Sequence, residues 1–149
     1  MLFIAWELPE ILVRLNKLSP DANPLWGNFT PQQMVEHLTD GLSMSMGKIE
    51  LPLEVTKERA EKSKQFLYSD APFGHDIKVN FVDSKKPLLY EDLDLAIDEL
   101  SMAFIAFTEY YEVNPKQKHL HPYFGYLTHE EWILLHKKHL THHLEQFGV

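Results

Sequence analysis

Apolar residues recur at three- and four-residue steps in several separate stretches of the chain, a spacing that predicts amphipathic helices. The longest stretch covers residues 90–113, where the apolar positions alternate between steps of four and three residues, as in helices that pack together. These positions are Leu93, Ile97, Leu100, Phe104, Phe107 and Tyr111. We expect one long helix here, ended by Asn114 and Pro115.

Two further helices are predicted with capping motifs at their first residues. Thr30 is followed by a proline and then, three residues on, by a glutamine, the order of an N-cap with a capping box. This helix is expected to run to about Met46 and to close at Gly47. Thr128 with Glu131 forms the same motif, and its helix is expected to last until Phe147 and Gly148.

Shorter segments connect these helices. Residues 9–18 predict a short amphipathic helix, and residues 56–67 predict a polar helix that we interpret as a solvated connection. Loops are expected over residues 21–28, 69–88 and 114–127. Within the second loop Ile77, Val79 and Phe81 alternate, a pattern typical of either a brief strand or extended chain.

Length and composition fit a single all-α domain. A chain of 149 residues supports one compact core, and 44% hydrophobic with 24% charged residues is typical of a globular protein. Long amphipathic helices without a convincing sheet favour an antiparallel bundle of about four helices over residues 1–149. A net charge of -8, with Arg14 and Arg59 as the only arginines, speaks against nucleic acid as a partner.

The apolar N-terminus does not have the features of a targeting or membrane segment. Residues 1–6 lack a basic start, are followed by Glu7 and are far too short to span a bilayer. The chain contains no cysteine, which excludes disulfides and thiolate ligands. We therefore expect a cytoplasmic protein with no membrane partner, in which any metal is held by imidazole and carboxylate groups.

Histidine is concentrated near the C-terminal end, where seven of the nine histidines follow residue 118. At about 100° per residue, one stripe of the last predicted helix carries four side chains. These are Trp132, His136, His139 and His143. The charged residues Glu130, Lys137, Lys138 and Glu145 are expected to point mostly elsewhere. Buried imidazoles each need a partner, and one metal ion satisfies several of them.

The spacing of His139 and His143 favours such an ion. Residues four apart on a helix bring two imidazoles toward one metal, with bonds near 2.0–2.1 Å. The third ligand must come from another helix, and His37 is the candidate because its helix face is also apolar. Three histidines leave a coordination position open for water, as in catalytic sites. Zinc is expected first, although nickel, manganese and iron also accept imidazole ligands.

Two segments resemble motifs of the DinB/YfiT-like superfamily of metalloenzymes. HPYFGYLT at residues 121–128, followed by EW and then by HLTHHLEQFG at residues 139–148, resembles its C-terminal signature. WGNFTPQQMVEHL at residues 26–38 resembles its first conserved helix, and the match is to a branch of unknown function. The resemblance implies an up-down-down-up four-helix bundle and a divalent ion on three histidines. Carried over by position, these are His37, His139 and His143.

The resemblance also implies a class of reaction. Characterised members of the superfamily include transferases that use small thiols such as bacillithiol or mycothiol, and some have isomerase activity. In better-known relatives the paired histidines are followed by Arg, Gly and Gln, whereas Leu144, Glu145 and Gln146 follow here. An anionic thiol favours an arginine near the ion. We expect a hydrolase or thiol transferase that acts on an unknown small molecule, its ion activating water or an external low-molecular-weight thiol.

Other site residues are predicted around the three ligands. The candidates for proton transfer or for supporting the ligands are Glu36, Asp40, His136 and His142. The candidates for the substrate entrance are His121, Tyr123, Tyr126 and Trp132. The simpler expectation places the two carboxylates at the surface, His136 in the core or at its rim, and His142 at the surface.

Two alternatives to an enzyme stay open from the sequence. The first is a metal-binding or stress-related helical protein without turnover, in which His136 or a carboxylate closes the coordination shell and no cavity adjoins it. The second is an all-α interaction module, a homodimer formed through Phe104 and Tyr110-Tyr111, in which the histidines are incidental.

Overall fold

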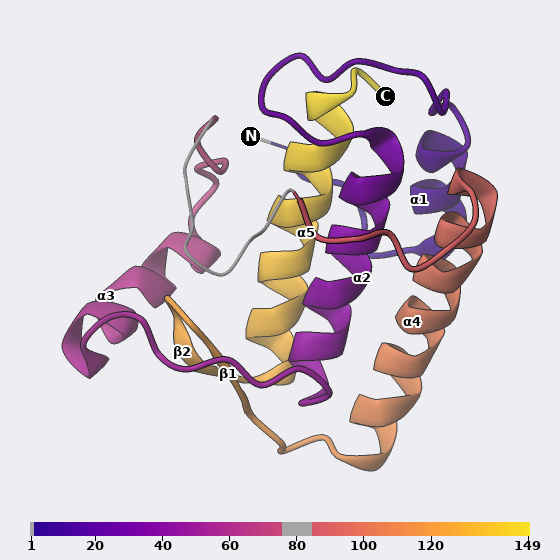
Figure 1. Ribbon diagram of the computed structural model, residues 1–149. Helices are drawn as coiled ribbons and strands as arrows, with labels where there is room; N and C mark the ends of the chain where they lie inside the picture. The colour runs from indigo at the N-terminus through magenta and orange to yellow at the C-terminus, as the bar shows by residue number, and fades with distance from the viewer. Residues whose placement is uncertain (1, 76–84) are drawn as a thin grey trace.

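The computed structural model describes residues 2–75 and 85–149, and it is mostly helical (Figure 1). In chain order the elements are α1 (Leu8–Leu15), α2 (Pro31–Ser45), α3 (Lys57–Tyr68), α4 (Leu93–Val113), β1 (His119–His121), β2 (Gly125–Leu127) and α5 (His129–Gln146). The mainly helical character expected from the sequence is confirmed. The prediction of a plain loop over residues 114–127 is wrong, because this segment contains a short antiparallel hairpin of β1 and β2. The alternating Ile77, Val79 and Phe81 lie outside the described residues.

Side-chain caps determine where the longer helices begin. The hydroxyls of Thr30 and Thr128 each accept a backbone N–H three residues on, and both predicted capping boxes are present. Asp92 caps α4 in the same way, so this helix begins at Leu93 rather than at residue 90. α1 ends at Leu15, three residues before the predicted end.

The helices α2 and α4 lie side by side and run in the same direction. Near their first turns the side-chain amide of Gln32 donates to the carbonyl of Tyr90 at 2.8 Å. Beside their last turns the hydroxyl of Tyr111 donates to the carbonyl of Ser45 at 2.6 Å. The helix α5 packs on α2 in the opposite direction, because His136 in its first half reaches Ser45 at the end of α2 (Figure 1).

The N-terminal segment follows the direction of α5. The backbone N–H of Ile4 donates to the hydroxyl of Thr141 at 3.0 Å, and the guanidinium of Arg14 donates to the carbonyl of Val149 at 2.6 Å. Residues 4–14 therefore run alongside the last turns of α5 in the same sense, and α1 packs against α4. The apolar opening of the chain is thus part of the core, where Ile4 is buried.

Lys138 of α5 is buried, which corrects the expectation that it points away from the core. Its ammonium group donates to the carbonyls of Ser69 and Ala71, and it lies 4.4 Å from the ring centres of Phe3 and Phe66. Burial lowers the pKa of this ammonium group. The two carbonyls and two aromatic faces replace water around the charge and hold the end of α3 against α5.

The residues at which the sequence places a dimer contact have partners within the chain. The ring of Phe104 lies 4.5 Å from that of Trp6, the hydroxyl of Tyr110 lies 2.6 Å from Nε2 of His119, and Tyr111 is buried. A homodimer stays a prediction. These intramolecular contacts occupy the side chains through which it was expected.

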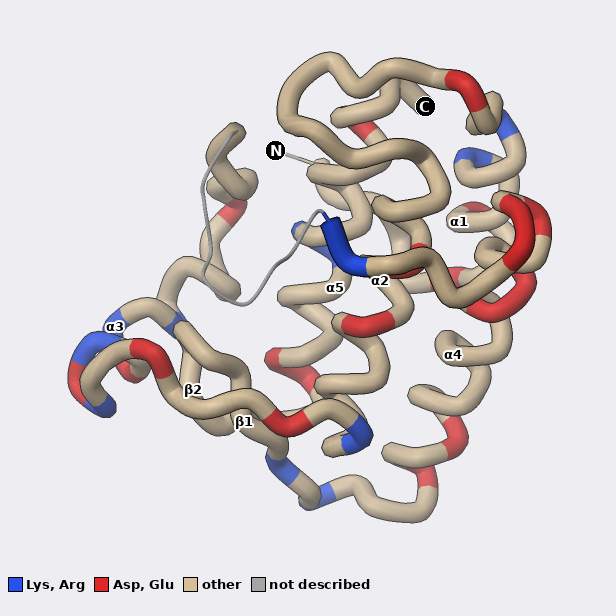
Figure 2. The backbone as a smooth tube through the Cα atoms, in the orientation of Figure 1, with Lys and Arg blue, Asp and Glu red and all other residues tan. Residues whose placement is uncertain are grey.

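Charge is distributed unevenly over the helices. Acidic residues gather near the two ends of α4, and residues 91–113 contain no lysine or arginine (Figure 2). Within residues 2–75 and 85–149, no helix combines the length and the apolar character that crossing a bilayer requires.

Candidate metal centre

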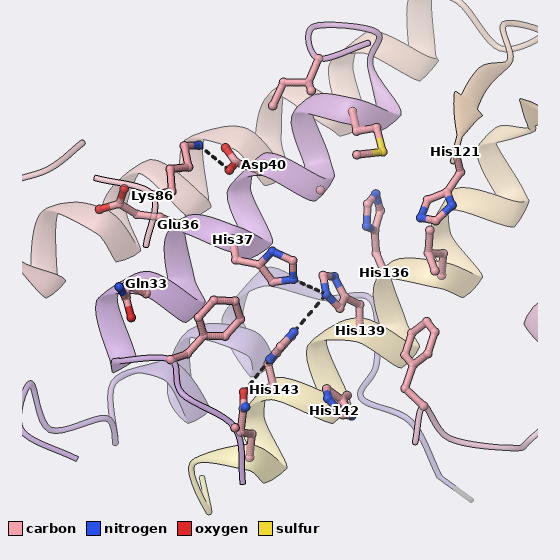
Figure 3. A pocket seen from close by; sticks show the side chains of 18 of the residues that line it. Gln33, Glu36, His37, Asp40, Lys86, His121, His136, His139, His142 and His143 are labelled. Atoms are coloured by element: carbon pink, nitrogen blue, oxygen red, sulfur yellow. Dashed lines mark hydrogen bonds and ion pairs between the residues drawn. The ribbon is translucent and has the colours of Figure 1, made fainter. Parts of the chain in front are cut away.

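Three histidines from two helices converge on one point. Nε2 of His139 lies 2.8 Å from Nε2 of His37 and 3.1 Å from Nε2 of His143 (Figure 3). One ligand atom from each of the three residues lies within 4.8 Å of the others. Metal–nitrogen bonds near 2.0–2.1 Å in a tetrahedral site place ligand nitrogens roughly 3.3 Å apart. The three histidines are therefore close enough to bind a metal ion.

The antiparallel packing of α2 and α5 brings the rings together. His139 and His143 lie one turn apart on α5, and His37 faces them from the middle of α2. One turn after His37, Gly41 keeps the space beside His139 open. A Cβ at Gly41 would lie 3.8 Å from Nδ1 of His139, so a side chain larger than alanine would fill this space.

Hydrogen bonds among the three imidazoles cannot provide a partner for every Nε2 atom of the cluster. The amide oxygen of Gln146 accepts a hydrogen bond from Nδ1 of His143 at 2.7 Å, so a neutral His143 carries a lone pair on Nε2. Nε2 of His139 can donate its single proton to only one of its two close neighbours. A cation, in contrast, accepts a lone pair from each of the three rings, and it therefore fits the donor set.

Burial keeps these imidazoles neutral. Loss of solvation lowers the pKa of His37 to about 4. The same loss, together with repulsion from neighbouring imidazoles, lowers the pKa of His139 and of His143 well below the ordinary value. Metal ions bind imidazole in its neutral form, so the rings need not lose protons before binding an ion at neutral pH.

The two predicted carboxylates lie beside the histidines, and neither belongs to the ligand cluster. Glu36 is buried, contrary to the simpler expectation of a surface charge, and it accepts the backbone N–H of Leu89 at 2.8 Å and the amide of Gln32 at 3.0 Å. Asp40 forms an ion pair of 2.7 Å with Lys86. Both carboxylates thus hold the segment before α4 against α2.

His136 is a core residue with its ring inside an aromatic stack. The centre of its ring lies 5.6 Å from that of Trp6 and 5.6 Å from that of Trp132, and the ring is nearly parallel to both. The hydroxyl of Ser45 donates to the carbonyl of Leu42, so it accepts a hydrogen bond from Nε2 of His136 at 3.0 Å. Burial lowers the pKa of His136 to about 3, so this ring is uncharged at neutral pH.

His142 lies next to the ligands without joining them. Its ring is 4.9 Å from that of His143, 5.4 Å from that of Trp26 and 6.1 Å from that of Phe73. His75 stacks on Trp26 with ring centres 3.5 Å apart. An aromatic group from two loops and α5 therefore borders the histidine cluster on this side.

A cavity of about 790 Å³ adjoins the three histidines. Its walls come from α2, α5, the hairpin, the segments that precede α2 and α4, and the segments that follow α2 and α3. His121, Tyr123 and Trp132, which were expected at a substrate pocket, line it. Burial lowers the pKa of His121 to about 3, and its Nδ1 accepts the backbone N–H of Tyr123 at 3.0 Å. Tyr126 is 61% exposed on β2 and is not part of the lining.

Sequence reasoning did not identify several residues of this site. Gln146 follows His143 by three residues and so shares its helix face, a signal that would have indicated the hydrogen bond. Phe29, whose ring lies 5.2 Å from that of His37, and Lys86 lie in connecting segments without periodicity. No local pattern indicates which loop residues reach a site built by other elements.

The geometry shows a three-histidine group beside a cavity large enough for a small molecule. The histidines come from segments that are far apart in sequence, and their imidazoles are neutral. Comparisons with protein-family models, with curated proteins and with solved structures found no match.

Proposed function

We propose that the protein is a divalent-metal-dependent enzyme of the DinB/YfiT-like type. His37, His139 and His143 hold the ion, and the convergence of their Nε2 atoms beside an open cavity is the observation that carries the proposal. Three histidine ligands leave a coordination position for water or substrate. The cavity of about 790 Å³ lies within the usual size range of small-molecule sites.

The order of the helices supports the proposed family. α1 and α5 run in one direction, whereas α2 and α4 run in the other, which supports an up-down-down-up order with α3 and the hairpin in the connections. These helix directions support the four-helix bundle that the resemblance of the two sequence motifs implies. The ligands lie on the second and fourth helices of that order, on facing surfaces.

The ion, when bound, lowers the pKa of a bound water or stabilises an external thiolate. The chain's own residues orient the ligands and shape the cavity. Gln146 holds His143 in the tautomer that directs Nε2 to the ion. His142 borders the cavity beside this ligand and is the candidate for moving a proton. Zinc is the first choice of metal for three imidazoles.

The non-catalytic alternative is a protein whose ion is fully enclosed by protein ligands. The expected fourth ligand was His136 or a carboxylate. The Nε2 atom of His136 is hydrogen-bonded to Ser45 and its ring stacks with two tryptophans. The carboxylates of Glu36 and Asp40 bind Leu89 and Lys86. A cavity also adjoins the histidines. These observations favour an open site and hence turnover.

Metal content of protein purified without a histidine tag tests the ion site. We expect about one ion per chain in the wild type, as one three-histidine site requires, and almost none in His139→Ala. His129→Ala is the matched control, because His129 stacks on Tyr111 at the start of α5, away from the cluster. Less than about half an ion per chain, unchanged in His139→Ala, would contradict the site.

Turnover is tested on the loaded protein. Uncharged esters and amides probe hydrolysis, and a small thiol with chlorodinitrobenzene probes thiol transfer. We expect turnover of one kind that depends on the ion and is lost in His139→Ala but kept in His129→Ala. A protein that is fully loaded with metal but turns over neither the esters and amides nor the thiol pair would instead support the non-catalytic alternative.

A further inference from the structure

The cavity extends from the histidine cluster along α5 toward its N-terminal half, where the lining becomes apolar. We infer that this part binds the uncharged, apolar body of the substrate, whose single polar head is held at the ion. The inference rests on the proposed metal-dependent function and adds the class of substrate. We call this part the apolar compartment. Its residues are Met44, Ile49, Leu51, Phe124, Trp132 and Leu135.

The passage from the ion site to the apolar compartment lies between α2 and α5. A Cβ at Gly41 would lie 3.8 Å from Nδ1 of His139 and 4.0 Å from Cε1 of His136, so no side chain of α2 closes the space at this level. One turn further on, Ser45 contacts His136. Figure 3 shows His136 and His121 continuing the row of imidazoles away from His143.

The two imidazoles of this part form uncharged walls. Nε2 of His136 forms a hydrogen bond with the hydroxyl of Ser45, and Nδ1 of His121 accepts a hydrogen bond from the backbone N–H of Tyr123. Burial lowers the pKa of both to about 3. The apolar compartment therefore presents aliphatic, aromatic and neutral imidazole surfaces at physiological pH, which favours an alkyl or aryl group over a charged one.

The charged side chains of the lining are already engaged. Among the lining residues that the structure describes, these are Glu36, Asp40 and Lys86. Lys86 pairs with Asp40 at 2.7 Å beside α2 (Figure 3), and Glu36 binds backbone N–H groups before α4. The two arginines of the chain do not line the cavity, since Arg14 binds the C-terminal carbonyl and Arg59 is exposed on α3. A carboxylate or phosphate on the substrate would find no arginine and no unpaired lysine among these residues.

Thiol binding to the cobalt-loaded protein tests the inference. Cobalt(II) takes the place of zinc in imidazole sites, and a thiolate on cobalt gives a charge-transfer band that reports the dissociation constant. The probes are ethanethiol, 1-butanethiol and 1-hexanethiol, with 3-mercaptopropionate as a charged counterpart. We expect about fourfold tighter binding for each added methylene group, and 3-mercaptopropionate to bind at least tenfold more weakly than 1-butanethiol.

Two variants locate the binding of the alkyl chain. Leu51→Trp fills the apolar compartment, so 1-hexanethiol is expected to bind at least tenfold more weakly, with ethanethiol unchanged. Leu53→Trp is the matched control, because Leu53 is partly exposed like Leu51 and lies outside the lining. Ile49→Trp serves as a second filling variant if Leu51→Trp does not fold, and the chain-length series on the wild type is decisive in either case.

The outcomes separate the two proposals. A chain that binds no cobalt overturns the proposed function and, with it, this inference. A fully loaded chain that binds 1-hexanethiol no more tightly than ethanethiol overturns the inference alone. Preference for 3-mercaptopropionate over 1-butanethiol, or equal effects of Leu51→Trp and Leu53→Trp, would overturn it in the same way.

Discussion

The amide oxygen of Gln146 lies 2.7 Å from Nδ1 of His143, and the amide nitrogen of the same side chain lies 2.9 Å from the carbonyl of Trp26. The second bond requires a donor on Gln146, so the oxygen must face the imidazole. This relationship determines which nitrogen of His143 carries the proton. It directs the lone pair of Nε2 toward His139 and His37.

Replacing Gln146 should weaken metal binding without removing a ligand. Gln146→Leu leaves His143 free to adopt either tautomer, and we expect zinc affinity to fall by about 10–100-fold. Competition with a chromophoric chelator at neutral pH measures this change. Glu145→Gln is the control, because Glu145 is exposed on the same turn and should leave the affinity unchanged. Equal affinities for wild type and Gln146→Leu would contradict the orienting role.

The metal-free protein should lose stability in mild acid. An unfolded histidine has a pKa near 6.5, whereas burial lowers the pKa of His136 to about 3. Between these values the unfolded chain binds the extra proton, so the free energy of unfolding falls as the pH decreases from about 6.5 toward 3. Four other histidines with lowered pKa values change the free energy of unfolding in the same direction. These are His37, His121, His139 and His143.

The variant His136→Phe measures the contribution of a single histidine to this pH dependence. It keeps the aromatic stack with Trp6 and Trp132 but cannot titrate. Urea unfolding between about pH 6 and pH 4.5 should therefore show a slope smaller by about 1.4 kcal/mol per pH unit than in the wild type. Identical slopes for the two proteins would contradict the buried, neutral state of His136.

Gly47, just after α2, should not tolerate a side chain. It has a φ of +74°, and a Cβ would lie 2.5 Å from Cε1 of His119, whose ring is held by the hydroxyl of Tyr110. Gly47→Ala should lower the free energy of unfolding by about 1–2 kcal/mol from backbone strain alone, with the clash adding to this.

Gly41→Ala is the matched control for that substitution. Its Cβ would meet no atom closer than 3.8 Å, and alanine favours a helix interior over glycine by about 1 kcal/mol. Urea unfolding of both variants should thus give changes of opposite sign. A stable Gly47→Ala protein would show that His119 is not held as described.

Removing the charge of Glu36 should loosen the segment before α4. Its two carboxylate oxygens accept the N–H of Leu89 and the side-chain amide of Gln32, whereas an amide in its place can accept at only one of these positions and presents a donor at the other. We expect Glu36→Gln to lower the free energy of unfolding by about 1–3 kcal/mol. Hydrogen exchange at the Leu89 amide should also be faster in this variant than in the wild type. Glu112→Gln, at an exposed position of α4, should change neither quantity.

Features that depend on a few neighbouring residues could be predicted from the sequence. The capping boxes at Thr30 and Thr128 form between residues three apart, and both are present. The pair His139 and His143 depends only on the helical repeat, so its shared direction followed from its spacing. The inward face of His37 was likewise readable from the apolar residues around it.

Features that depend on contacts between distant segments required the tertiary structure. The approach of His37 to His139 joins residues 102 positions apart, and packing alone sets its distance. Glu36 and Lys138 are buried although charged residues are expected at the surface. Their burial is possible because backbone groups from other segments form hydrogen bonds with the charged groups. The hairpin at residues 119–127 gave too short an alternation to be recognised.

The sequence by itself thus determined where most helices begin, which faces they bury and which imidazoles share a helix face. These properties follow from hydrogen bonds and side-chain spacing within one or two helical turns. Only the tertiary structure decided the cavity, its apolar compartment and the partners of the buried charges. Such features arise where segments from across the chain meet, and their geometry depends on how all of them pack together.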